Sequence, residues 1–127
     1  MNTLPKVLII DDSSLARLMI RDIVTELGME AHEAQTADEG IHRFKDIKPR
    51  FVVLDIMLSG KNGLEALAEI RGYDNDAIII MCTSIIGQED VINKAIEFGA
   101  DDYITKPFKK EEMMRIFRKY GENLVQE

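Results

Sequence analysis

The chain has 127 residues, of which 46% are apolar and 31% are charged, so we expect one globular domain over residues 1–127. Lys and Arg total 16 against 23 Asp and Glu, and the net charge of −7 argues against nucleic acid as a direct partner, since no basic excess is present to displace counterions. The N-terminus lacks a signal-peptide pattern and no apolar run approaches the length of a membrane span, so we expect a cytoplasmic protein that does not bind membranes.

The first part of the chain is predicted to form a strand followed by a helix. Residues 7–10 are all apolar, as in a buried strand. A hydroxyl at Ser13 or Ser14 suits the N-cap of a helix, and Gly28 is placed to end it. The apolar stripe expected on this helix comprises Leu15, Leu18, Met19, Ile23 and Leu27.

The second and third strands are predicted from two different patterns. Residues 29–34 alternate between apolar and polar, which predicts an edge strand with one face in water. Thr36 and Glu39 have the spacing of a capping box, which predicts the start of the next helix. Residues 51–54 are apolar throughout, which predicts a strand that is buried on both faces.

Another strand and two helices are predicted in the following segment. Residues 59–63 have the composition of a loop, and a helix follows from Leu64. Residues 77–82 form an apolar strand that ends in Cys82. Because this is the only cysteine, it cannot form an intramolecular disulfide, and we expect a buried thiol. A further helix is predicted over residues 88–99.

A strand over residues 103–105 and a helix from Lys109 to about Leu124 complete five alternations of strand and helix. Helices between strands require parallel pairing through right-handed crossovers. The middle strands are apolar without alternation, which implies that helices cover both faces of the sheet. The predicted fold class is α/β, a doubly wound five-stranded parallel sheet in a (βα)5 three-layer sandwich.

Polar groups follow four of the predicted strands. Asp11 and Asp12 follow the first strand, Asp55 the third, Thr83 the fourth and Lys106 the fifth. Ligands of open α/β sheets bind at the carboxyl edge, so we expect these side chains to converge there. Two like charges 4 Å apart repel by roughly 4 kcal/mol at an effective dielectric constant near 20, so either some acids are protonated or a cation lies among them. Hard oxygen ligands favour Mg²⁺ or Mn²⁺.

Such a site can handle phosphoryl groups. Asp55 can attack phosphorus as a carboxylate nucleophile and form an acyl phosphate. Lys106 can neutralise one phosphoryl oxygen, and Thr83 can donate a hydrogen bond to another. An isolated pair of acids after a strand is more often a solvated helix start. It is the joint placement with Lys106 that favours a chemical role.

With these residues at these spacings, the chain resembles the CheY-like response-regulator receiver domains of two-component signalling. The resemblance extends from VLIIDD at 7–12 to GADDYITKPF at 99–108. It implies the flavodoxin-like strand order 2-1-3-4-5 known for this fold. It also implies a sensor histidine kinase as phosphoryl donor. A downstream protein, or a second copy of the chain, would bind on the face formed by the last two predicted helices and the strand between them. No enzymatic activity is implied beyond the domain's own phosphotransfer and slow autodephosphorylation.

The resemblance further implies which residues accept the phosphoryl group and bind the metal. Asp55 would be the phosphoacceptor. Asp11 and Asp12 would bind Mg²⁺ or Mn²⁺ together with Asp55 and the backbone carbonyl of Met57.

The remaining site residues would contact the phosphoryl group or transmit its presence. Lys106 and Thr83 would contact the group, and Thr83 and Tyr103 would form a switch pair, with packing alone as the alternative role for Tyr103. Ser59 departs from the family's usual proline at that position, and a serine there restricts the backbone of the loop less.

Other functions stay open on the sequence alone. A Mg²⁺-dependent phosphatase of the haloacid dehalogenase type also uses an aspartate nucleophile. That family carries Asp-x-Asp after the first strand, whereas Ser13 stands two residues after Asp11 here. The chain is alternatively the receiver half of a longer transcription regulator. A degenerate receiver that acts as an unmodified scaffold is disfavoured by the intact set of site residues.

Overall fold

The computed structural model describes residues 4–57, 62–84 and 89–121. The strands are β1 (Lys6–Ile10), β2 (Glu30–Ala34), β3 (Phe51–Asp55), β4 (Ile78–Thr83) and β5 (Asp102–Thr105). The helices are α1 (Ser14–Glu26), α2 (Ala37–Ile47), α3 (Gly63–Tyr73), α4 (Glu89–Glu97) and α5 (Lys110–Tyr120). Ser59 and the helix start predicted at Gln88 lie outside the described residues, whereas α5 ends at Tyr120, earlier than the end predicted near Leu124.

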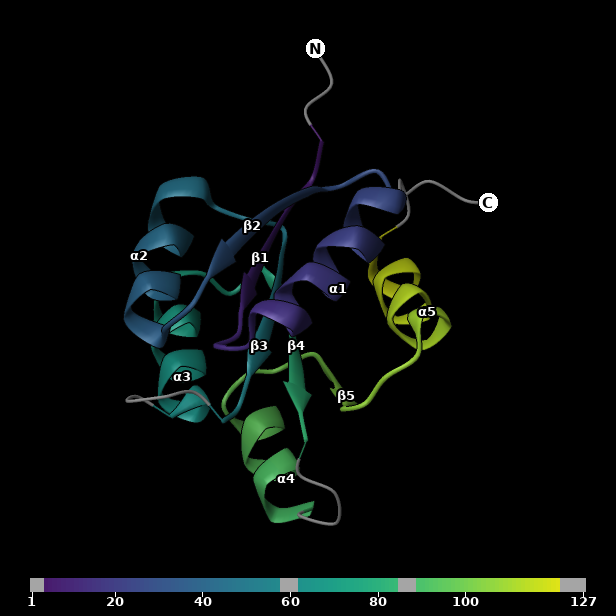
Figure 1. Ribbon diagram of the computed structural model, residues 1–127. Helices are drawn as coiled ribbons and strands as arrows, with labels where there is room; N and C mark the ends of the chain where they lie inside the picture. The colour runs from purple at the N-terminus through teal and green to yellow at the C-terminus, as the bar shows by residue number, and fades with distance from the viewer. Residues whose placement is uncertain (1–3, 58–61, 85–88, 122–127) are drawn as a thin grey trace.

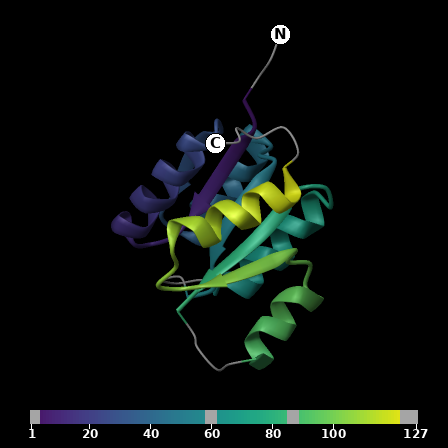
Figure 2. The same cartoon turned by 90° about the vertical axis from the view of Figure 1, so that its right-hand side faces the viewer.

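All the strands pair in parallel in one sheet, in the order β2-β1-β3-β4-β5. Helices α1 and α5 cover one face, and α2 and α3 cover the other, so the sheet is the middle of three layers (Figure 1). In Figure 2, α5 lies in front of the sheet and α4 stands below β5. The predicted fold class is confirmed, as is the edge position of β2. Within the described residues, none of the helices is both long enough and apolar enough for a bilayer crossing.

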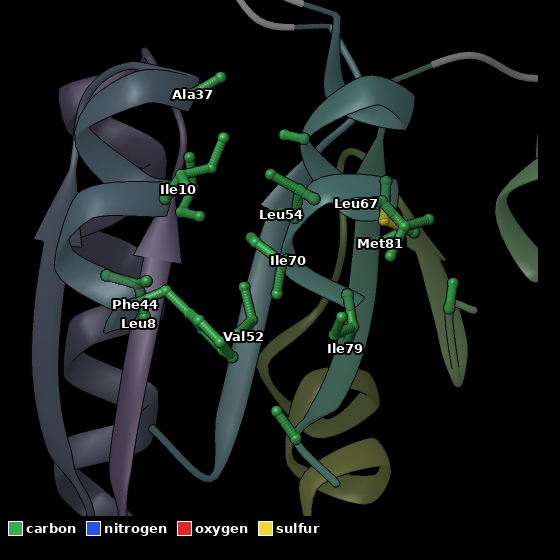
Figure 3. Packing of buried hydrophobic residues seen from close by; sticks show 14 of the residues in the cluster. Leu8, Ile10, Ala37, Phe44, Val52, Leu54, Leu67, Ile70, Ile79 and Met81 are labelled. Carbon is green, nitrogen blue, oxygen red and sulfur yellow. The ribbon is translucent and has the colours of Figure 1, made fainter. Parts of the chain in front are cut away.

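Two buried clusters lie on opposite sides of the sheet, because successive side chains of a strand point to opposite faces. Leu8 and Ile10 of β1 belong to the cluster beneath α2 and α3, together with Phe44 (Figure 3). Val7 and Ile9 belong to the cluster beneath α1 and α5. Full burial of one such side chain contributes about 1.5–3 kcal/mol, so the two clusters hold the strands, and with them the strand ends, in fixed positions.

Side-chain oxygens cap the first two helices. Of the two serines considered for α1, Ser13 is the N-cap, and its hydroxyl accepts from the N–H of Ala16 at 3.2 Å. Thr36 caps α2 by accepting from the N–H of Glu39 at 3.1 Å. The reciprocal half of the predicted capping box is shifted by one residue, because the Glu39 carboxylate accepts from the N–H of Gln35 at 2.6 Å.

The apolar stripe predicted on α1 is only partly right. Its later members Ile23 and Leu27 are buried, but Leu15, Leu18 and Met19 are exposed, the first two at 65% and 52%. The residues that pack on the sheet are spaced three and four apart, as expected of a helix. The buried face begins about one turn later in α1 than the predicted stripe. The buried face consists of Ile20, Ile23, Val24 and Leu27.

Helix α3 begins directly against the end of β3, through a cap that the sequence pattern did not single out. The side chain of Asn62 accepts from the N–H groups of Leu64 at 2.7 Å and Glu65 at 3.2 Å. The N–H of Gly63 donates to the carbonyl of Ile56 at 2.8 Å. The start of α3 therefore supports the strand end that carries the central acid of the predicted site.

We expect Gly63→Ala to destabilise the fold. An added Cβ would lie 2.4 Å from the carbonyl oxygen of Asp55 and 2.5 Å from Cα of Ile56, and backbone atoms cannot turn away as a side chain can. Such overpacking costs about 1–3 kcal/mol, which urea unfolding would measure.

The matched control is Gly72→Ala in the same helix, where no described atom lies within 4 Å of the added Cβ. Because alanine favours helix over glycine, this variant should gain about 0.5–1 kcal/mol. Equal unfolding free energies for the two variants would contradict the close contact between α3 and β3.

Candidate functional site

The carboxyl ends of the strands bring the predicted site residues together. Asp11 follows β1 and is buried, Asp12 is exposed beside it, and Asp55 ends β3 in a buried position. Carboxylate oxygens of these three acids lie within 4.8 Å of one another. Thr83 ends β4 with its side chain fully buried, and Lys106 follows β5. The convergence expected from the strand ends is thus present in the fold.

Backbone N–H groups orient both buried carboxylates. Oδ1 of Asp11 accepts from the N–H of Ser13 at 2.9 Å, and Oδ1 of Asp55 accepts from the N–H of Met57 at 3.0 Å. Each bond spans two residues, so each acid is held by the turn that leaves its own strand. The second oxygen of each carboxylate is engaged by a side chain from the other end of the chain.

That side chain is Lys106. Its Nζ donates to Oδ2 of Asp11 at 2.8 Å and to Oδ2 of Asp55 at 3.3 Å. Its own N–H donates to the carbonyl of Thr83 at 2.6 Å, which ties the segment after β5 to the end of β4. The ammonium group therefore lies between the two buried acids and compensates part of their charge.

Burial and neighbouring charges shift the pKa values of Asp55 and Lys106. Burial raises the pKa of Asp55 and the charge of Asp11 adds to this, while the Met57 N–H and the ammonium of Lys106 oppose it without cancelling it. Burial alone would favour neutral Lys106, but its hydrogen bond to Asp11 and the charge of Asp55 outweigh burial and raise the pKa of the amine. Lys106 is therefore charged at neutral pH.

Cys82 lies next to Asp55 in the register of β3 and β4. Burial raises the pKa of its thiol to about 12, so it stays neutral at physiological pH. The sequence prediction of a buried thiol is confirmed. Because a neutral buried thiol is a poor nucleophile, Cys82 does not compete with Asp55.

The acid cluster has the composition of a site for a hard divalent cation. With all three acids ionised and Lys106 charged, two negative charges are left uncompensated, which is the charge that one divalent ion would balance. Carboxylate oxygens suit Mg²⁺, which takes one or two of them and keeps several waters. Asp12 is exposed, so an ion can approach the cluster from solvent while the hydrogen bonds of the buried acids Asp11 and Asp55 stay intact.

Tyr103 lies outside this cluster. It pairs with Met81 in the register of β4 and β5, and its side chain is 42% exposed. Ile96 in α4 and Phe98 just after it are exposed as well.

The hydrogen bonds of two arginines were missed on the sequence, and one of the two, Arg17, lies beside the site. Arg17 donates through Nη1 to the backbone carbonyl of Asp11 at 2.7 Å. Arg71 of α3 donates to the carbonyls of Gly99 and Ala77, both at 2.6 Å, and to Oδ2 of Asp101 at 2.8 Å. Such bonds join a side chain to backbone groups far along the chain, and no local sequence pattern reports them.

The chain belongs to the response-regulator receiver family. The family model of the response regulator receiver domain matches residues 7–118, which run from the second residue of β1 to within two residues of the end of α5. The family assignment expected from the site residues is therefore confirmed. The chain is a CheY-like receiver domain of two-component signalling, a phosphorylation-activated signalling switch. The alternative of a haloacid-dehalogenase-type phosphatase is not supported.

Individual relatives agree with this family. The chain is 44% identical over 109 residues to the chemotaxis protein CheY of Halobacterium salinarum, covering 86% of this chain and 90% of that protein. It is 39% identical over 115 residues to CheY of Thermotoga maritima, covering 90% and 95%. A CheY-like receiver domain from Methanospirillum hungatei has the same fold, with a TM-score of 0.87, 25% identity and coverage of 93% of this chain and 94% of that chain. A longer transcription regulator is not better supported by these matches.

The raised pKa of Asp55 predicts that this acid destabilises the metal-free fold. The unfolded chain releases the proton near pH 3.8, whereas the native state holds it to higher pH. Below that pH both states are protonated and no penalty exists. As the pH rises through the native pKa, the ionised carboxylate weakens the native state. We therefore expect Asp55→Asn to unfold at a higher temperature than wild type at pH 7 in EDTA.

The difference between the two proteins should shrink as the pH is lowered toward 4, and calorimetry over this range would measure it. Asp22→Asn, at an exposed position of α1, serves as the control and should leave the unfolding temperature nearly unchanged. An Asp55→Asn variant that is less stable than wild type at pH 7 in EDTA would show that the ionised acid is instead a stabilising member of the site.

Proposed function

We propose that Asp55 accepts a phosphoryl group from a sensor histidine kinase in a Mg²⁺-dependent reaction, and that the modified domain then changes its binding to a partner protein. The observation that carries this proposal is the position of the Asp55 carboxylate. It lies at the end of β3, within the acid cluster and 3.3 Å from Nζ of Lys106. An acid so placed has the ammonium group of Lys106 beside one carboxylate oxygen and two further acids that could hold a metal ion.

The metal ligands in this proposal are the carboxylates of Asp11, Asp12 and Asp55 and the backbone carbonyl of Met57. The cluster of the three acids and its uncompensated negative charge support this assignment. Mn²⁺ would serve in place of Mg²⁺, since both prefer oxygen ligands. When bound, the ion supplies positive charge that offsets the charge of the phosphoryl oxygens during transfer.

Asp55 acts as the nucleophile. One of its carboxylate oxygens forms a bond to phosphorus as the bond from phosphorus to the donor imidazole breaks, which leaves an acyl phosphate and a neutral histidine on the kinase once a proton is taken up. The longer contact of Lys106 is the one to Asp55, at 3.3 Å against 2.8 Å to Asp11. Lys106 can therefore exchange Asp55 for a phosphoryl oxygen while Asp11 keeps the ammonium in place. Thr83 donates its hydroxyl to another phosphoryl oxygen.

The domain's own catalysis is limited to this transfer and to slow loss of the phosphoryl group to water. Its signal is passed on as a change in the surface that binds the partner protein. Of the residues in α4, only Ala95 is buried, so this helix is weakly held and can respond to movement of Thr83 at the end of the neighbouring strand β4. Ile96, Phe98 and Tyr103 are exposed apolar residues in or next to α4 and β5, where a partner could contact them.

Tyr103 and Thr83 act together in this output. If the hydroxyl of Thr83 moves to bond the phosphoryl group, the space it leaves allows the exposed Tyr103 ring to turn inward. The face formed by α4, β5 and α5 then differs between the two states and binds a downstream protein or a second copy of the chain. Residues 1–127 act as one receiver domain in this scheme.

Phosphorylation of Asp55 is tested with a small phosphoryl donor. We expect acetyl phosphate with Mg²⁺ to add a phosphoryl group to wild type, detected as a mass increase of the intact protein, because the site contains both the nucleophile and the charges that the transfer needs. Asp55→Ala should not be modified, and EDTA should prevent modification of wild type. Modification of both proteins, or modification that ignores the chelator, would rule out this site.

Coupling through Thr83 is tested with Thr83→Ala. This variant should still be modified on Asp55, because the nucleophile and Lys106 are intact. It should lose the amide chemical-shift changes that modification causes in α4 and β5 of wild type, since a ligand shifts an equilibrium only through contacts that differ between the two states. Ser84→Ala removes a neighbouring exposed hydroxyl and should behave as wild type. Wild-type shift changes in Thr83→Ala would place the coupling elsewhere.

A further inference from the structure

Arg17 in α1 links the loop that carries the metal-binding acids to the edge strand of the sheet. Its Nη1 donates to the backbone carbonyl of Asp11 at 2.7 Å, and its Nε donates to Oε1 of Glu33 in β2 at 2.9 Å. The side chain is only 14% exposed, so both bonds are shielded from water. Two different nitrogens of one planar guanidinium make the two bonds, which a lysine with its single nitrogen could not reproduce in the same geometry.

Glu33 is itself held in place. Its other oxygen, Oε2, accepts from Nε of Arg21 at 2.6 Å. Burial disfavours the charged form of Glu33, but hydrogen bonds from Arg21 and Arg17 outweigh burial and lower the pKa of this carboxyl. The acid is therefore charged at neutral pH and presents a fixed acceptor to Arg17. Its strand β2 pairs with β1 in parallel register, with Glu33 opposite Ile9.

Both backbone polar groups of Asp11 are thus anchored to β2. Its N–H donates to the carbonyl of Ala34 at 3.1 Å, and its carbonyl is held by Arg17 and, through it, by Glu33. The carbonyl belongs to the planar peptide that joins Asp11 to Asp12. Fixing the direction of this carbonyl fixes the plane of the peptide and hence the direction in which Asp12 leaves the strand.

We propose that Arg17 is a positioning residue for the divalent cation site. By holding the peptide between Asp11 and Asp12, it places the exposed carboxylate of Asp12 beside the buried acids, so that the site is formed before the ion arrives. This inference rests on the metal site of the proposed function. It assigns to Arg17 a role in metal affinity that acts through a backbone carbonyl, that of Asp11.

The sign of the effect separates positioning from simple electrostatics. Arg17 is a cation close to the site, so its removal would strengthen binding of Mg²⁺ if charge alone mattered. Loss of positioning weakens binding instead, because the carboxylate of Asp12 must then be ordered when the ion binds. The two explanations therefore predict opposite changes in the dissociation constant.

The test is a titration of wild type and Arg17→Met with Mg²⁺, followed by amide chemical shifts well below the unfolding temperature of either protein. We expect the dissociation constant of Arg17→Met to rise about tenfold, the lower end of the effect of residues that orient metal ligands. Arg17→Lys keeps the charge but not the two-nitrogen geometry, and it should also bind Mg²⁺ more weakly than wild type. Arg17→Lys also provides the test if Arg17→Met does not fold.

The matched control is Arg21→Met. It removes the same charge from the same acid but leaves the bond from Arg17 to Asp11 intact. Its dissociation constant should be unchanged or lower. Unfolding temperatures in EDTA are measured in parallel, since a merely structural role would lower the unfolding temperature of Arg17→Met and leave the affinity of its folded state unchanged.

Three outcomes would overturn the proposal. They are unchanged or stronger binding of Mg²⁺ to Arg17→Met, wild-type affinity in Arg17→Lys, and equal weakening in Arg17→Met and Arg21→Met. If wild type itself shows no saturable binding, the metal site of the proposed function fails and this inference fails with it. Saturable binding to wild type with wild-type affinity in Arg17→Met overturns only the role of Arg17.

Discussion

One ammonium group connects the parts of the chain on which the site depends. Nζ of Lys106 donates to Asp11, 95 residues earlier, and to Asp55, 51 residues earlier. The two acids are buried and repel each other, so without this lysine their charges would be uncompensated in a region of low dielectric. The same bonds keep Lys106 charged despite its own burial. The lysine and the acids therefore require each other, and the remaining negative charge of the cluster is what favours a divalent cation.

The fold explains why this interaction occurs at the edge of the sheet. Apolar side chains of β1, β3 and β4 fill both faces, and the helices cover them, so polar groups of these strands can be accommodated only where the strands end. Parallel pairing brings all of those ends to one edge. Contacts from two helices fix the strand ends. Gly63 of α3 packs against the end of β3, and Arg17 of α1 donates to the carbonyl of Asp11 after β1. The carboxyl edge of the sheet thus holds both the acids and the helix contacts that keep them in place.

Much of this arrangement could be predicted from the sequence, because it depends on patterns that are local. Strand runs that end in Asp11, Asp55 and Thr83 predicted both the sheet and the convergence of the acids. The face of α1 was mispredicted because its sequence offers apolar residues on two sides, and only packing on the sheet selects between them. Arg17 was missed for a different reason, since its two bonds join a side chain to a backbone carbonyl and to a distant strand, and neither has a sequence signature.

A crystal structure of the protein with Mg²⁺ and beryllofluoride, a stable mimic of a phosphoryl group on a carboxylate, would show which residue accepts the phosphoryl group and which residues hold the metal ion. We expect beryllium bonded to a carboxylate oxygen of Asp55 and Mg²⁺ in contact with the acid cluster. We also expect Lys106 to leave Asp55 for a fluorine while it keeps its bond to Asp11. Beryllofluoride bound to another residue, or a metal ion that touches none of Asp11, Asp12 and Asp55, would contradict the proposed function.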